Sequence, residues 1–334
     1  MTTRRTLLKS AAGAFAAGTL AAPGLVRAQA ADAVSLRLNW YIGGLHAPYY
    51  LGKERGFFSA ERIDLTINEG RGSANTVQTI ASKSDTFGMA DSGSLMALAA
   101  RGAPIRAVMS VLNSTSFGVI SPADRPIRTA QEMRGKRLAA GPGGAPALLL
   151  PAVLAANRLT RDDVTLVQVD PAAVPVTVME GRADGLLGGV DDQPFLMAQR
   201  GFRTHSLTYG EMGVDIVGMT ILAHEDTIRS SADMIRRFVR AAQRSWQAAQ
   251  ENPGAAVEAI LKVKPDLNRE SQLGQLNVDL GLQHSAATRG RPTGWASPDD
   301  YERTLRLMKE YRDLQTDRPA TAFYTNEFLP AQGS

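Results

Sequence analysis

The stretch SLRLNWYIGGLHAP, residues 35–48, opens the segment that decides the fold. Apolar residues alternate with polar ones from Val34 to Trp40, which predicts a half-buried strand. A loop with two glycines follows, and Pro48 suits the first turn of a helix. The same order of strand, glycine-rich loop and helix returns before residue 94. Strands that alternate with helices predict a mostly parallel sheet.

A second unit of the same kind begins near residue 117 and does not repeat the first sequence. The apolar run Ile216–Ala223 predicts a strand that returns the chain to the first unit, and the residues from Ser230 onward have helical spacing. We therefore predict an α/β protein with two lobes, each a mostly parallel sheet flanked by helices, and two hinge crossings. The predicted divisions are an export signal over 1–30, lobe 1 over 31–113 and 221–334, and lobe 2 over 114–220.

The first thirty residues predict an export signal that is removed from the mature chain. Arg4 and Arg5 precede a weakly apolar run, and Ala28-Gln29-Ala30 is a small-x-small cleavage site. The paired arginines favour a twin-arginine signal, and a general secretory signal is the alternative. A retained membrane anchor is not expected, because a span needs roughly twenty strongly apolar residues.

Charge and cysteine content narrow the class of protein further. The predicted signal carries four basic residues and no acid, so its removal takes the formal net charge from +4 to zero. A neutral mature chain argues against a nucleic-acid partner. The chain has no cysteine, which excludes disulfides and a lipid anchor on an N-terminal cysteine. We expect a soluble monomer in the periplasm.

Several ordered motifs resemble the family of periplasmic binding proteins that serves nitrate, sulfonate, taurine and thiamine-pyrimidine-precursor importers. The motifs are LNW (38–40), HAPYY (46–50), KERGFF (53–58), GRGS (70–73), FGMAD (87–91), GW (294–295), DDY (299–301) and YTNEFLP (324–330). The resemblance covers nearly the whole mature chain. It implies a receptor that captures a small molecule and delivers it to the permease and ATPase subunits of an ABC importer. Many relatives have Gly-Ser in the second-lobe loop where this chain has Gly143-Gly144-Ala145-Pro146, so a hydroxyl contact to an anion is missing.

In parallel sheets, ligands bind beyond the carboxyl ends of the strands. Gly72-Ser73 and Gly143-Gly144 lie there, at predicted helix N-termini whose free N–H groups bind anions. The alternative is turn chemistry, in which glycine only supplies unusual dihedral angles.

Aromatic residues gather around the first loop. We expect Trp40, and with it Tyr49, to stack on a planar ligand, and core packing is the alternative. His46 lies in the same loop and is a candidate ligand contact.

The remaining candidates are polar residues at strand ends. Asp191 and Asp192 follow an apolar strand and could accept hydrogen bonds from an amino-bearing or cationic ligand, although Asp192 could instead cap the next helix. Ser92 ends another strand. Asn113 lies at the first crossing, in either a hinge or a ligand role.

These patterns predict a binding protein and no enzyme. The four histidines lack metal-ligand spacing, no nucleophile elbow is present, and we expect neither cofactor nor catalytic residue. The resemblance brings in a pyrimidine synthase with a cysteine-rich motif and a desulfinase with a cysteine nucleophile, chemistries that a chain without cysteine cannot perform. The predicted ligand is a pyrimidine-like heterocycle or small aromatic. The alternatives are a receptor for sulfonate, taurine or nitrate, and a ligand-sensing subunit of a membrane kinase.

Overall fold

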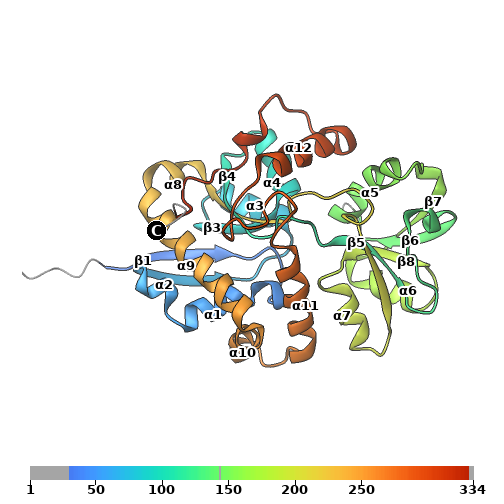
Figure 1. Ribbon diagram of the computed structural model, residues 1–334, viewed down its shortest axis with the longest axis horizontal. Coiled ribbons are helices and arrows are strands. Elements are labelled where there is room, and N and C mark those ends of the chain that lie inside the picture. The colour runs from blue at the N-terminus through green and yellow to red at the C-terminus, as the bar shows by residue number, and fades with distance from the viewer. Residues whose placement is uncertain (1–29, 143, 331–334) are drawn as a thin grey trace, which may run out of the picture. The chain divides into compact units, whose positions relative to one another are not determined.

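The computed structural model describes residues 30–142 and 144–330, and the predicted export signal lies outside them up to residue 29. Within those ranges the strands form two five-stranded sheets, with the orders β2-β1-β3-β10-β4 and β7-β6-β8-β5-β9 (Figure 1). The first sheet consists of β1 (Asp32–Arg37), β2 (Ile63–Asn68), β3 (Phe87–Asp91), β4 (Ile105–Ser110) and β10 (Met219–His224). The second consists of β5 (Phe117–Pro122), β6 (Lys136–Ala140), β7 (Val164–Gln168), β8 (Gly185–Gly189) and β9 (Thr204–Thr208).

Helices flank both sheets, and each sheet with its helices is called a lobe (Figure 1). The helices that precede the return to the first sheet are α1 (Ala47–Glu54), α2 (Phe57–Ala60), α3 (Ser73–Ala81), α4 (Ser92–Ala100), α5 (Ala145–Ala156), α6 (Val174–Met179) and α7 (Gln193–Ala198). Those after it are α8 (Glu225–Ser230), α9 (Ala232–Glu251), α10 (Pro253–Val263), α11 (Arg269–Leu282) and α12 (Pro298–Arg312).

The prediction of two mostly parallel sheets is confirmed, with one reversed strand in each. Strand β1 pairs in parallel with β2 and β3, whereas β10 runs antiparallel to β3 and β4. Likewise β6 is parallel to β7 and β8, whereas β5 is antiparallel to β8 and β9. Each reversed strand is the first one after the chain arrives from the other lobe. It enters from the edge where the parallel strands end, and therefore runs against them.

The alternation along each strand divides the core of a lobe into two faces. In β10, Ile221 and Ala223 pack in the cluster that contains Trp246 of α9. Leu222 lies between them in sequence and packs in the other cluster, with Val77 of α3. The inner strands β3 and β10 are therefore buried along their whole length, whereas β1 and β2 alternate between buried and exposed positions.

The two crossings, residues 111–116 and 209–218, are joined to each other by Asp215. Its carboxylate accepts from Ser114 Oγ at 2.8 Å and from the Thr115 N–H at 3.1 Å. The predicted strand Ile216–Ala223 is shorter than expected, because its first three residues belong to the crossing. The lobe boundaries given above remain predictions.

Candidate functional site

The loop after β1 is held in place by the loop before α3. The Gly70 N–H donates to Trp40 O at 3.0 Å, and the Gly72 N–H donates to Asn39 O at 2.8 Å. A Cβ at Gly70 would lie 1.9 Å from Leu38 O, so only glycine allows this approach. These backbone contacts fix the position of Trp40 without using its side chain.

The two aromatic rings that follow the first strand are half-exposed. Trp40 is 45% and Tyr41 47% exposed, and their rings meet edge to face with centroids 5.4 Å apart. Rings of this size usually bury most of their surface, and their uncovered faces can stack on a planar ligand. Tyr49 differs: it is fully buried and packs edge-on against Trp246 at 6.1 Å. The structure thus places Trp40 where a ligand can reach it and Tyr49 in the core.

His46 is buried and already uses both ring nitrogens. Its Nδ1 accepts from the Gly43 N–H at 3.1 Å, so Nε2 carries the proton and donates to Asn39 Oδ1 at 2.8 Å. Burial lowers the pKa of His46 to about 4, and the nearby Glu69 carboxylate opposes that shift only in part. The imidazole is therefore neutral at pH 7 and positions the loop.

The polar residues around α3 and α4 are also engaged within the fold. Gly72 precedes α3 with φ of 114°, a conformation that favours glycine. Ser73 Oγ accepts from the Asp91 N–H at 3.1 Å. Ser92 is fully buried and its hydroxyl donates to Val217 O. The Ser92 hydroxyl is thus committed to the crossing rather than to a ligand.

The second-lobe glycine loop offers fewer donors than expected. Gly143 lies outside the described residues. The Gly144 N–H donates to Gly141 O at 3.1 Å, and Pro146 in the first turn of α5 has no N–H. With the hydroxyl also missing, this helix start is poorly equipped to hold an anion.

Asp191 and Asp192 follow β8 and are held close to the backbone. A Cβ at Gly189 would lie 2.4 Å from Asp191 Oδ1, so glycine makes room for this carboxyl. Burial raises the pKa of both aspartates, in Asp192 to about 8, where the charge of Asp191 adds to the effect. Asp192 Oδ2 accepts from Gln193 Nε2 at 3.4 Å, and Asp192 Oδ1 is buried without a donor.

Helix α11 carries a buried polar stripe that the sequence did not single out. Its members recur every three or four residues on one face: Gln272, Gln275, Asp279 and, just past the end of the helix, Gln283, with exposures of 4%, 7%, 0% and 1%. Gln275 Oε1 accepts from the Gly44 N–H at 3.1 Å in the first-lobe loop. Asp279 faces Asp191 and Asp192 of the second lobe. Asn113 Nδ2 in the first crossing donates to Gln283 O at 2.9 Å.

This helix thus brings together candidates from three parts of the chain: the loop bearing Trp40 and His46, the crossing residue Asn113, and the aspartates of the second lobe. Among the described residues, no hydrogen bond joins Gly72, Ser73, Ser92 or Gly144 to this helix. Helix α11 also packs directly against α7 of the second lobe, since a Cβ at Gly274 would lie 2.2 Å from Phe195 Cε1.

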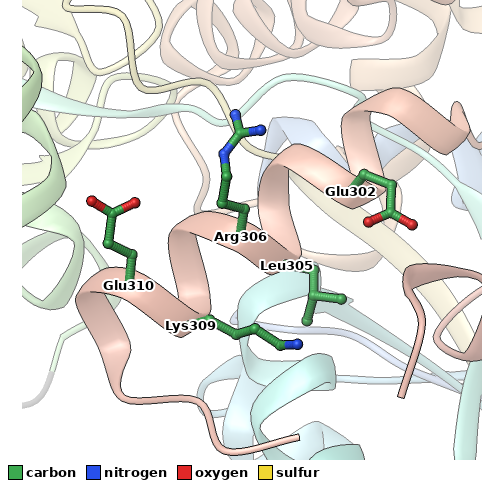
Figure 2. A pocket seen from close by; sticks show the side chains of 5 residues that line it. All are labelled: Glu302, Leu305, Arg306, Lys309 and Glu310. Atoms are coloured by element: carbon green, nitrogen blue, oxygen red, sulfur yellow. The ribbon is translucent and has the colours of Figure 1, made fainter. Parts of the chain in front are cut away.

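A shallow surface hollow of about 410 Å³ lies elsewhere, along α12 (Figure 2). Its lining is Glu302, Leu305, Arg306, Lys309 and Glu310. Figure 2 shows these side chains spread along one helix without a common centre. A ligand site needs polar groups that converge, so we place the site at α11.

Neither a metal site nor a membrane-spanning helix is found in the part of the chain that the structure describes. No group of three or more His, Cys, Asp or Glu side chains there is arranged to hold a metal ion. None of its helices is long and apolar enough to cross a membrane.

Two α/β lobes joined by two crossings form the periplasmic binding protein fold. The chain belongs to the NMT1/THI5 like family, whose profile matches residues 44–256. The family resemblance expected from the sequence motifs is thereby confirmed.

Individual relatives agree with this placement. The riboflavin-binding protein RibY of Chloroflexus aurantiacus is 24% identical over 327 residues, which cover 94% of this chain and 91% of that protein. Among solved structures, the alkanesulfonate-binding protein SsuA of Xanthomonas axonopodis pv. citri, bound to MOPS, matches with a TM-score of 0.68. Its identity is 16%, over 89% of this chain and 99% of that one, so this likeness shows the fold alone.

The prediction that this chain is not an enzyme is wrong, because enzymes are found among its relatives. A protein of Legionella pneumophila named 4-amino-5-hydroxymethyl-2-methylpyrimidine phosphate synthase is 23% identical over 312 residues, covering 89% of this chain and 92% of that protein. Enzymes therefore occur among its full-length relatives. Lack of cysteine excludes only chemistry at a sulfur atom and does not separate the chain from those relatives.

Proposed function

We propose that this protein is the extracytoplasmic receptor of an ABC importer and captures a flat, hydrogen-bonding heterocycle or small aromatic between its lobes. One observation carries the proposal: α11 contacts the loop bearing Trp40 and faces Asp191 of the other lobe. A ligand held there touches both lobes and favours the closed arrangement over the open one, which is what a receptor requires.

The half-exposed rings of Trp40 and Tyr41 support a planar ligand. Relatives named for riboflavin and for an aminopyrimidine point the same way, since both molecules contain flat nitrogen heterocycles. A receptor for sulfonate, taurine or nitrate needs mainly donors. Here the Gly144 N–H and the Ser92 hydroxyl are already used, and buried carboxyls lie opposite.

Export and delivery belong to the same proposal. Cleavage after Ala30 would release the receptor into the periplasm, where it would meet the permease and ATPase subunits of its importer. N-terminal sequencing of the periplasmic protein should begin at Ala31, and intact Arg4-Arg5 in a membrane fraction would contradict this. Neighbouring genes for a permease and an ATPase, rather than for a sensor kinase, would separate import from sensing.

Calorimetry against a panel of aminopyrimidines, riboflavin, aromatic acids, taurine and nitrate tests the ligand class. We expect a heterocycle or aromatic to bind most tightly and to compact the protein in small-angle scattering. Tight binding of taurine or nitrate alone would overturn the ligand class. Conversion of the bound heterocycle into a new product would instead place this chain with the synthases of its family.

A further inference from the structure

Buried hydrogen-bond acceptors without donors gather on α11 and on the second-lobe loop that faces it. In the described residues they are both carboxyl oxygens of Asp279, Gln272 Oε1, Asp192 Oδ1 and Gln193 Oε1. They outnumber the unpaired groups of the same stripe that can donate, which are Gln283 Nε2 and the Ser271 hydroxyl. Nearly all buried polar atoms in native structures have a partner, so a group of orphaned acceptors in one place calls for donors that the folded chain does not itself supply.

The orphaned groups of α11 point toward the other parts of the site. Gln272 and Asp279 are seven residues apart and share one face of the helix. Gln272 Oε1 would lie 3.5 Å from a Cβ at Gly43, so it reaches the first-lobe loop. Asp279 is fully buried and faces Asp191 and Asp192. The acceptors therefore line a path from one lobe to the other.

No basic side chain of the described residues lies beside this cluster to offset the charge that its carboxyls acquire when they ionise. Asp191, Asp192 and Asp279 lie together, and no Lys or Arg in the described part of the chain forms an ion pair with any of them. The groups that face these carboxyls are one another, Ser116 beside Asp191 and Gln193 beside Asp192. Two facing carboxyls can hydrogen-bond to each other only when one holds a proton, and burial raises the pKa of all three.

We propose that the ligand carries a positive charge and at least two N–H donors, as an amidinium or a protonated amino-heterocycle does, and that Asp279 and Gln272 of α11 recognise it together with Asp192. The inference rests on the proposed function and adds the charge of the ligand and two recognition residues to it. A bound cation supplies both the missing donors and the missing counter-charge. It also favours the ionised carboxylates, so binding releases protons from the cluster into the buffer.

Three probes with the same ring test the charge: benzamidine is a cation with N–H donors on two nitrogens, benzamide is its neutral isostere, and benzoate is an anion. Calorimetry of the full mature chain at pH 7 should find benzamidine bound at least tenfold more tightly than benzamide, the lower end of what a charge-assisted hydrogen bond contributes, and benzoate weakest. Repeating the titration in buffers of different ionisation enthalpy should reveal proton release with benzamidine and none with benzamide.

Two matched variants test whether Asp279 is responsible for the preference for a cation. Asp279→Asn keeps the shape of a protonated aspartate, and should abolish most of the benzamidine preference and reduce proton release. Asp266→Asn removes the same charge from an exposed position just before α11 and should change neither.

Equal affinity for benzamidine and benzamide, tighter binding of benzoate, no benzamidine binding at millimolar concentration, or an unaltered preference in folded Asp279→Asn would each overturn the inference. If neutral heterocycles from the panel still bind while the charge preference is absent, this inference fails and the proposed receptor function stands. If only taurine or nitrate binds, this inference and the proposed ligand class both fail.

Discussion

Replacing Trp40 with alanine separates ligand stacking from stability. The side chain is 45% exposed, and its main ring contact is the edge of Tyr41 at 5.4 Å. The backbone bond from Gly70 to Trp40 O at 3.0 Å does not depend on the side chain. We therefore expect Trp40→Ala to fold normally. Removing a ring that stacks on a flat ligand costs about 1–3 kcal/mol, which corresponds to a loss of affinity of roughly 5- to 150-fold.

Calorimetry with the tightest-binding member of the panel measures that loss, and fluorescence provides a second readout. The chain has three tryptophans, of which Trp246 is fully buried and Trp40 half-exposed. Ligand stacking should quench the emission of the exposed ring, and the quenching should disappear in Trp40→Ala.

Two companion variants make the result specific. Trp40→Phe keeps an aromatic face and should recover most of the affinity. Tyr41→Ala removes a ring of similar exposure and reports whether Tyr41 also contacts the ligand. An unchanged dissociation constant in Trp40→Ala, with an unchanged melting temperature, would refute the stacking argument.

Three further changes test how the site is positioned. The pKa of His46 falls from 6.5 to about 4 on folding, so between these values the unfolded chain binds more protons than the folded one. The free energy of unfolding must therefore fall as the pH drops through this range, by on the order of 3 kcal/mol. His46→Gln should remove this pH dependence, which urea unfolding at pH 4.5 and 7 would check. Gly274→Val adds side-chain atoms at a position where a Cβ would already lie 2.2 Å from the Phe195 ring. With ligand bound, small-angle scattering should therefore find this variant less compact than the unaltered protein, and its affinity for the ligand should be more than tenfold lower. Asp215→Ala removes the bonds to Ser114 and Thr115 and should lower the melting temperature, since each such bond contributes about 1 kcal/mol; an unchanged melting temperature would show that the crossings do not depend on it.

The sheets could be predicted because their information is local. Alternation over residues 34–40 predicts a strand that overlaps β1 (Asp32–Arg37), and the apolar run Ile216–Ala223 predicts one that overlaps β10 (Met219–His224). Strand β9, Thr204–Thr208, could not be predicted in this way. It is a short edge strand with only Leu207 deeply buried, so its apolar pattern is weak.

The role of α11 depends on tertiary contacts. Gln272 and Asp279 belong to a helix that also carries an apolar face around Leu276. In isolation, polar residues that flank such a face indicate a solvated surface. The first-lobe loop at Gly43 and Gly44 and the second lobe, with Phe195 against Gly274, bury them together. The composition of the stripe does give a weak indication that it is buried. It consists of amides and one aspartate, whereas exposed helix faces usually carry Lys and Glu.

Unused hydrogen-bond capacity separates ligand groups from structural groups better than position in the sequence does. A polar side chain at the carboxyl end of a strand can either bind a ligand or complete the loop that it begins. Ser92 and His46 lie at such ends, and their partners within the chain account for their polar atoms. Asp192 and Asp279 lie nearby and retain oxygens without donors. Since leaving such an atom unpaired in the interior costs about 1–3 kcal/mol, a ligand that supplies donors gains that energy on binding, whereas a ligand near Ser92 or His46 would first have to break bonds that the fold already makes.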